Sequence, residues 1–134
     1  MKGQPILEVH SKSVTITVKE ISQSGIKMEQ NATDMITGKV NAAGFSTVSI
    51  LQKIDGTSEW DTKGVMTSNE GDFIAIWGKG TGRNTSPTTA AWQGELHFMS
   101  QSPKLAWLNN VKGWVEGSGD QVKGEATGRI YEQK

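Results

Sequence analysis

The sequence contains no cysteine, and this absence excludes several kinds of protein. Disulfide-stapled folds, thiolate nucleophiles and cysteine-ligated metal sites all require that residue. A chain without cysteine also fits a reducing compartment, so we expect a cytoplasmic protein.

Proline, long apolar runs and excess charge are also scarce. Only three prolines occur among 134 residues and no stretch has the composition of a linker, so residues 1–134 are expected to form a single domain. No segment approaches the run of about 20 apolar residues that a membrane helix needs, and the first 14 residues lack the apolar segment of a signal peptide. Because the formal net charge is zero, neither nucleic acid nor a membrane surface is expected as a partner.

Glycine and tryptophan are plentiful by contrast, with 16 and five residues respectively. The glycines recur along the chain, which is typical of bends and turns between strands. Val14–Val18 alternates apolar and polar side chains, as a half-buried strand does. About eight to ten such segments occur along the chain in all, at spacings of roughly 10 to 12 residues. We therefore predict an all-β fold, a closed antiparallel barrel of about eight strands.

The expected strands alternate with turn signals. Gly44 should break one strand, Asp55-Gly56 is a strong hairpin dipeptide, and Lys104–Asn109 is the only expected helical turn. The nine strands expected are Val14–Val18, Ile26–Gln30, Ile36–Ala42, Phe45–Ile54, Glu59–Thr67, Asp72–Gly82, Thr88–Gln101, Val111–Gly117 and Val122–Tyr131.

The stretch GDFIAIWGKGTGR, residues 71–83, raises the question of a phosphate-binding loop. A P-loop places Ser or Thr after its lysine, but Lys79 is followed by Gly80, and no amphipathic helix comes next. Gly78, Gly80 and Gly82 lie two residues apart, so they share one face of a strand. Such a row lets a bulky neighbour cross the strand, and Trp92 is the expected neighbour.

No catalytic or metal-binding motif is evident. His10 and His97 lie in unrelated contexts without ligand spacing, so no metal site is expected. The serines lack a Gly-x-Ser-x-Gly elbow. No cofactor is expected, and whether the protein is an enzyme stays open.

The candidate site residues are aromatic, with one carboxylate. Trp114 and Glu116 share a face of their strand. Glu116 has a raised pKa if it enters an apolar barrel, and is a solvated charge if it points outward. We predict that an aromatic wall binds ligand with Glu116 as its polar anchor, and that Glu116 is also the candidate catalytic group. The proposed ligand-binding residues are Trp77, Trp92, Phe98, Trp114 and Glu116.

The carboxy-terminal two-thirds resembles an uncharacterised prokaryotic family of small barrels with an allene oxide cyclase-like fold. The matching segments include Asp55-Gly56, the glycine series Gly78, Gly80 and Gly82, the run Ala91-Trp92-Gln93-Gly94, Ser102–Ala106, Glu116 and Tyr131-Glu132. The resemblance implies a closed antiparallel barrel that assembles as an oligomer. It implies no activity, and no catalytic residue of the plant cyclase can be aligned.

Three interpretations of function stay open. The first is a homo-oligomeric barrel that binds a small hydrophobic or amphipathic molecule. The second is an isomerase or cyclase acting on an unsaturated substrate in the barrel, since a shaped apolar pocket and one carboxylate can suffice. The third is a structural barrel filled by its own side chains. Self-association is expected because both faces of Phe73–Trp77 are apolar.

Overall fold

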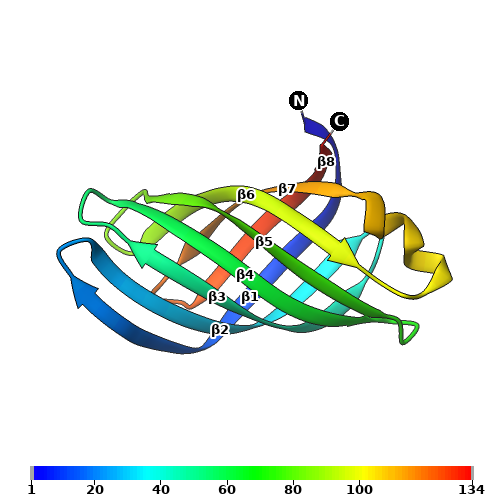
Figure 1. Cartoon of the computed structure of the whole chain (residues 1–134), viewed down its shortest axis with the longest axis horizontal. Helices are drawn as coiled ribbons and strands as arrows, with labels where there is room; N and C mark the ends of the chain where they lie inside the picture. Colours follow the sequence, from blue (N-terminus) through cyan, green and yellow to red (C-terminus); the bar gives the residue numbers. More distant parts are fainter. Residues whose placement is uncertain (1, 134) are drawn as a thin grey trace.

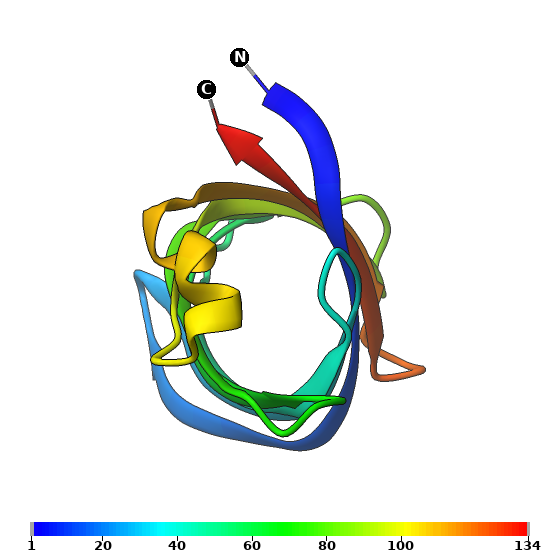
Figure 2. The same ribbon diagram turned by 90° about the vertical axis from the view of Figure 1, so that its right-hand side faces the viewer.

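The computed structural model describes residues 2–133 and forms one closed antiparallel barrel (Figure 1). Each strand pairs with the next along the chain, and β8 pairs with β1 to close the ring, which is seen end-on in Figure 2. This confirms the predicted fold class. The elements are β1 (Lys2–Ser22), β2 (Gly25–Gly38), β3 (Ala42–Gln52), β4 (Thr57–Ser68), β5 (Phe73–Asn84), β6 (Thr89–Met99), the 3₁₀ helix η1 (Pro103–Asn110), β7 (Lys112–Asp120) and β8 (Glu125–Gln133).

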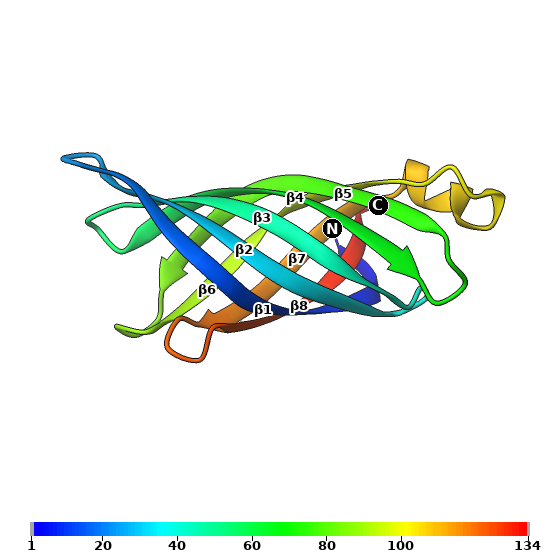
Figure 3. The same cartoon turned by 90° about the horizontal axis from the view of Figure 1, so that it is seen from below.

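β1 is far longer than the expected strand Val14–Val18. It runs for 21 residues and pairs with both β2 and β8. Its register to β2 shifts between Ser13 and Thr15 and again between Val18 and Glu20, and bulges of this kind bend a strand. The outer part of the β1–β2 ribbon consequently projects past the neighbouring hairpins (Figure 3).

The expectations for the next two strands were wrong in their boundaries. Ile26–Gln30 and Ile36–Ala42 were expected as separate strands, but β2 is continuous and ends at Gly38. Gly44 lies inside β3 instead of breaking it. A Cβ on Gly44 would lie 1.9 Å from the backbone oxygen of Val65, so glycine here permits close approach of two paired strands.

The final expected strand also began too early. Val122 lies in the turn between β7 and β8 and is exposed, and β8 begins at Glu125. The expectation relied on the apolar side chain of Val122. The turn is instead stabilised by Asp120, whose carboxylate accepts hydrogen bonds from the backbone nitrogens of Val122 and Lys123.

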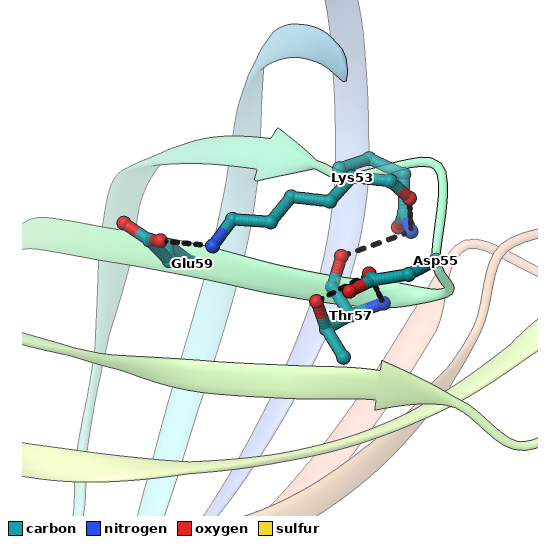
Figure 4. A network of polar contacts seen from close by, with 5 residues as sticks. Lys53, Asp55, Thr57 and Glu59 are labelled. Atoms are coloured by element: carbon teal, nitrogen blue, oxygen red, sulfur yellow. Dashed lines mark hydrogen bonds and ion pairs between the residues drawn. The ribbon is translucent and has the colours of Figure 1, made fainter. Parts of the chain in front are cut away.

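The Asp55-Gly56 turn was predicted correctly and joins β3 to β4 (Figure 4). Gly56 has a φ of +89°, a conformation that favours glycine. Asp55 accepts hydrogen bonds from the backbone nitrogen and the hydroxyl of Thr57 at 2.9 and 2.6 Å, which lower the pKa of its carboxyl. Beside the turn, Lys53 Nζ and Glu59 Oε2 form an ion pair at 2.5 Å.

The hydrophobic core fills the end of the barrel that carries η1. Leu105 and Leu108 of this helix are buried in the core, and the helix lies over the barrel end (Figure 2). This helix matches the expected helical turn. Within residues 2–133, no helix is long and apolar enough to cross a membrane. The other core residues are Ile6, Leu7, Ile36, Val40, Ala42, Met66, Ile74, Ile76, Leu96, Phe98, Val111, Val115 and Ile130.

Candidate functional site

The half of the barrel away from η1 has an inner surface unlike the core. On β5, the buried residues Ile74 and Ile76 face inward, and by strand alternation so do Gly78, Gly80 and Gly82. This confirms that the three glycines share one face. Three more glycines occupy inward positions, Gly94 of β6, Gly117 of β7 and Gly128 of β8. In the strand registers Gly94 pairs with Gly80 of β5, and Gly117 pairs with Gly128.

Two tryptophans lie over these glycines. Trp60 of β4 covers Gly80 and Gly94, since a Cβ on either residue would come within 2.7 Å of Cζ2 of its indole ring. Trp92 of β6 covers Gly117 and Gly128, where an added Cβ would meet ring atoms at 2.5 and 2.8 Å. The absent side chains therefore provide flat surfaces on which the indole rings rest.

The two rings also contact each other. Their centroids are 6.0 Å apart with an interplanar angle of 85°, an edge-to-face pair. Trp60 Nε1 donates a hydrogen bond to the backbone oxygen of Thr81 at 3.1 Å, which satisfies the polar atom of the ring. Trp92 was expected to lie across the glycines of β5. This was wrong, because the indole ring that covers Gly80 belongs to Trp60.

Polar side chains line the inward face of β1 to β3. Gln30 Nε2 donates a hydrogen bond to Ser13 Oγ, and Ser11 Oγ donates one to Asp34 Oδ1 at 2.5 Å. Ser46 lies beside them on β3, paired with Ala32 in the register. In the closed strand order β2 and β6 are separated by three strands on either side, so β2 lies across the barrel from the strand that carries Trp92, whereas Trp60 lies on β4, two strands from β2.

Asp34 is the most unusual of these residues because its carboxyl is buried. Only 7% of the residue is exposed, and Oδ2 accepts no hydrogen bond from the described residues. Burial raises the pKa of this carboxyl above its ordinary value, and the hydroxyl groups of Ser11 and Ser46 oppose the shift only in part. An unsatisfied buried polar atom is uncommon in folded proteins and requires an explanation.

The five predicted site residues are divided between the two faces of the sheet. Trp92 and Phe98 point inward, whereas Trp77, Trp114 and Glu116 occupy outward positions. The idea of a single wall was therefore wrong, because it assumed that tryptophans of neighbouring strands share a face. Phe98 is buried in the core, and Trp77 is 42% exposed and stacks on His97 at 5.7 Å.

Glu116 lies outside the barrel, which decides between the two alternatives for its direction. It follows Val115, which is buried in the core, and it precedes Gly117, which lies under the ring of Trp92. Trp114 Nε1 donates a hydrogen bond to Glu116 Oε2 at 3.2 Å. The pair of residues predicted to share a face does so, but on the outer surface.

A hollow of about 1240 Å³ lies at the strand ends away from η1. Residues of β1 to β7 on both faces of the sheet border it, among them Trp60 and Trp92 from the inner face and Trp114 and Glu116 from the outer face. Among residues 2–133, no group of three or more histidine or acidic side chains could hold a metal ion.

Sequence reasoning missed Trp60 and Asp34. The signal for Asp34 was the period of two that runs from Met28 to Ile36, which places Asp34 on the same face as the buried Ile36. The signal for Trp60 was weaker. It becomes clear only once the register pairs Trp60 with Gly80.

Comparisons with known proteins are informative about the fold. No family model and no curated protein matches the sequence. Among solved structures, a protein of unknown function from Clostridium acetobutylicum matches with a TM-score of 0.85 and 14% identity over 96% of each chain. A conserved protein of unknown function from Rhodopseudomonas palustris matches with a TM-score of 0.83 and 9% identity over 96% of this chain and 95% of that one. An enzyme from Penicillium herquei matches with a TM-score of 0.65 and 20% identity over 98% of each chain. At these identities the matches show a shared barrel fold.

Proposed function

We propose that the protein is a small-molecule-binding barrel whose open half takes an amphipathic ligand. The observation that carries this proposal is the pair Trp60 and Trp92, which lie half-buried on a glycine surface and border the hollow, in a barrel whose strands β1 to β3 carry inward hydroxyl and carboxyl groups. Binding sites in barrels combine an apolar wall with a few placed polar groups. The apolar part of the ligand contacts the indole rings and its polar part contacts the polar side chains of the barrel.

A thermal-shift screen of small aromatic compounds, followed by titration of each hit, tests this function. A compound that binds the native state raises the melting temperature. Trp60→Phe and Trp92→Phe should weaken binding, since each reduces the aromatic surface with little loss of packing. Trp77→Phe is the matched control, because Trp77 is on the outer face. The function is wrong if no compound stabilises the protein, or if only Trp77→Phe alters binding.

A second candidate is an isomerase or cyclase acting on an unsaturated substrate inside the barrel. It is favoured by Asp34, whose raised pKa suits a carboxyl to donate and accept a proton. The structural match to an enzyme from Penicillium herquei, at a TM-score of 0.65, is in keeping with this candidate.

Hydrogen exchange in the substrate distinguishes the two candidates. An enone with an enolisable position is incubated with the protein in D₂O and followed by NMR. Catalysed deuterium incorporation that disappears in Asp34→Asn would support an enzyme. Incorporation at the background rate with both proteins would leave only the binding function.

We also propose that the chain is one of the allene oxide cyclase-like barrels. Its eight strands in sequential antiparallel order and its likeness to bacterial barrels of unknown function support this assignment.

A further inference from the structure

We propose that the hollow takes an uncharged aromatic ligand carrying a carbonyl group, whose oxygen accepts hydrogen bonds from Trp92 Nε1 and Ser58 Oγ. The proposal rests on the binding function above and names the chemical class of the ligand. It starts from these two donors, which belong to residues that line the hollow and which have no hydrogen-bond partner among residues 2–133.

Ser58 and Trp92 lie beside each other, although they belong to different strands. Both residues pair with Gly82 of β5, Ser58 from the side of β4 and Trp92 from the side of β6. A Cβ on Gly82 would lie 2.7 Å from Ser58 Oγ and 3.5 Å from Cβ of Trp92. The glycine therefore leaves room for both side chains at one place on the inner face, and all three residues border the hollow.

Trp60 differs from Trp92 in its polar atom. Trp60 Nε1 already donates a hydrogen bond to the backbone oxygen of Thr81 at 3.1 Å. Both rings of the edge-to-face pair thus offer apolar surface to a ligand, but only Trp92 adds a donor that the chain leaves without an acceptor. A carbonyl oxygen has two lone pairs and can accept from the indole nitrogen and from a hydroxyl group together.

The inner wall of the hollow carries no charge. The side chains that border the hollow from inward positions are Met28, Ile50, Ser58, Trp60 and Trp92, and none of them ionises. The charged residues that border it occupy outward positions, apart from Lys19 at a bulge and Lys53 at a turn, and they are five basic and five acidic residues: Lys19, Lys27, Lys53, Lys79, Arg83, Glu29, Glu59, Asp61, Glu95 and Glu116.

This distribution of charge favours a neutral ligand. A charged group placed against the inner wall would lose water without gaining an opposite charge, which costs more than the face of an indole ring returns to a cation. The equal numbers of basic and acidic residues at the rim give neither sign an advantage. The indole rings supply the apolar contacts that an aromatic body prefers.

The test uses four probes that share one benzene ring, namely acetophenone, ethylbenzene, benzoate and benzylammonium. Each is titrated against the whole chain by calorimetry. Acetophenone should bind about tenfold more tightly than either charged probe. In ¹⁵N-labelled protein, the indole N–H resonance of Trp92 should shift downfield with acetophenone, and ethylbenzene should not cause this shift.

Variants assign the hydrogen bonds. The ratio of the acetophenone affinity to the ethylbenzene affinity should fall about fivefold in Trp92→Phe and in Ser58→Ala, because each removes a donor to the carbonyl oxygen. Trp60→Phe is the matched comparison, since it removes an indole whose nitrogen is already engaged. It should weaken both probes equally and leave the ratio unchanged.

The outcomes separate this inference from the proposed function. If benzoate or benzylammonium binds as tightly as acetophenone, or if Trp92→Phe and Ser58→Ala keep the affinity ratio, the inference is overturned while ligand binding survives. If none of the four probes binds at millimolar concentration, the inference falls, and the screen described above decides the binding function by itself. Trp77→Phe and Ser118→Ala change outward residues that do not border the hollow, so a changed ratio in either would also overturn it.

Discussion

The indole rings of Trp60 and Trp92 meet edge to face at 6.0 Å, although β5 lies between the strands that carry them. The contact is possible because the inward positions of β5 at this level, Gly80 and Gly82, carry no side chain. The shape of the candidate site thus depends on the lack of side chains at these glycines as well as on the aromatic rings.

We expect Gly117→Ala to lower the free energy of unfolding by about 1–3 kcal/mol, the range for overpacking in a well-packed interior. A Cβ at Gly117 would lie 2.5 Å from Cζ2 of Trp92 and 2.4 Å from the backbone oxygen of Thr127. Urea denaturation measures the change. Gly119→Ala is the control on the same face, since its Cβ would meet atoms at 3.2 Å or more. Equal losses in the two variants would contradict a specific clash with Trp92.

Asp34→Asn should stabilise the protein more at neutral pH than in acid. The folded pKa of Asp34 is raised, whereas an unfolded aspartate titrates near about 3.9. Between these two values the native state holds a proton that the unfolded state has lost, so stability falls as pH rises through the window. The penalty is complete above the folded pKa and absent below the unfolded one.

Denaturation of the Asp34→Asn variant and the wild type at a series of pH values checks this sign. Asp55→Asn serves as a contrast, because hydrogen bonds from Thr57 lower the pKa of Asp55, so any contribution it makes is lost as pH falls. A stability difference for Asp34→Asn that is constant across pH would show that the carboxyl titrates alike in both states.

Truncating the helix that covers the barrel end should be costly. Leu108 is 1% exposed and belongs to the core, so Leu108→Ala should lower the free energy of unfolding by about 2–5 kcal/mol. Trp107→Ala is the control, since Trp107 is adjacent and 38% exposed. A smaller loss for Leu108→Ala than for Trp107→Ala would mean that η1 does not complete the core.

Self-association is expected through the outer apolar patch, defined here as Phe45, Val65, Ala75, Trp77 and Met99. The strand registers place Phe45, Val65, Ala75 and Met99 in one row across four strands, and a hollow of about 370 Å³ lies beside Trp77. Monomers rarely leave a contiguous apolar patch in water, so a second copy of the chain should cover it.

Sedimentation velocity tests this association. The wild type should sediment with a mass above the 14.5 kDa of one chain, and Phe45→Lys should shift it toward the monomer. Ile54→Lys is the control, because Ile54 is exposed in the turn between β3 and β4 and lies outside the patch. A wild type that remains monomeric at micromolar concentration would contradict the prediction.

Much of the barrel could be predicted from strand alternation and turn residues, as at Asp55-Gly56. The predictions that were wrong depended on how neighbouring strands pair, which the sequence of a single strand does not show. Gly44 has the appearance of a strand breaker, yet the register shows it to be a point of close approach to Val65. Alternation assigned Trp77, Trp92 and Trp114 correctly within their own strands, but it cannot state which face of one strand matches which face of the next.

The candidate site was harder to predict for the same reason. Asp34 and Ser11 are 23 residues apart in sequence and meet only because β1 and β2 pair in a particular register. The carboxyl was overlooked because Asp34 falls between the expected strands Ile26–Gln30 and Ile36–Ala42 and was assigned to neither. Continuous alternation through Asp34 was the better guide.

The pairing of β1 with β8 has a consequence for biosynthesis. Glu8 of β1 pairs with Arg129 of β8, and the two residues lie 121 positions apart in the chain (129 − 8). During translation, β1 and β2 emerge first and wait with one edge of β1 unpaired until β8 has left the ribosome. Closure over such a sequence separation is slow, and an exposed edge invites wrong pairing meanwhile. The bulges of this long first strand and its exposed Lys12 and Lys19 are features that discourage wrong pairing at an edge until the barrel closes.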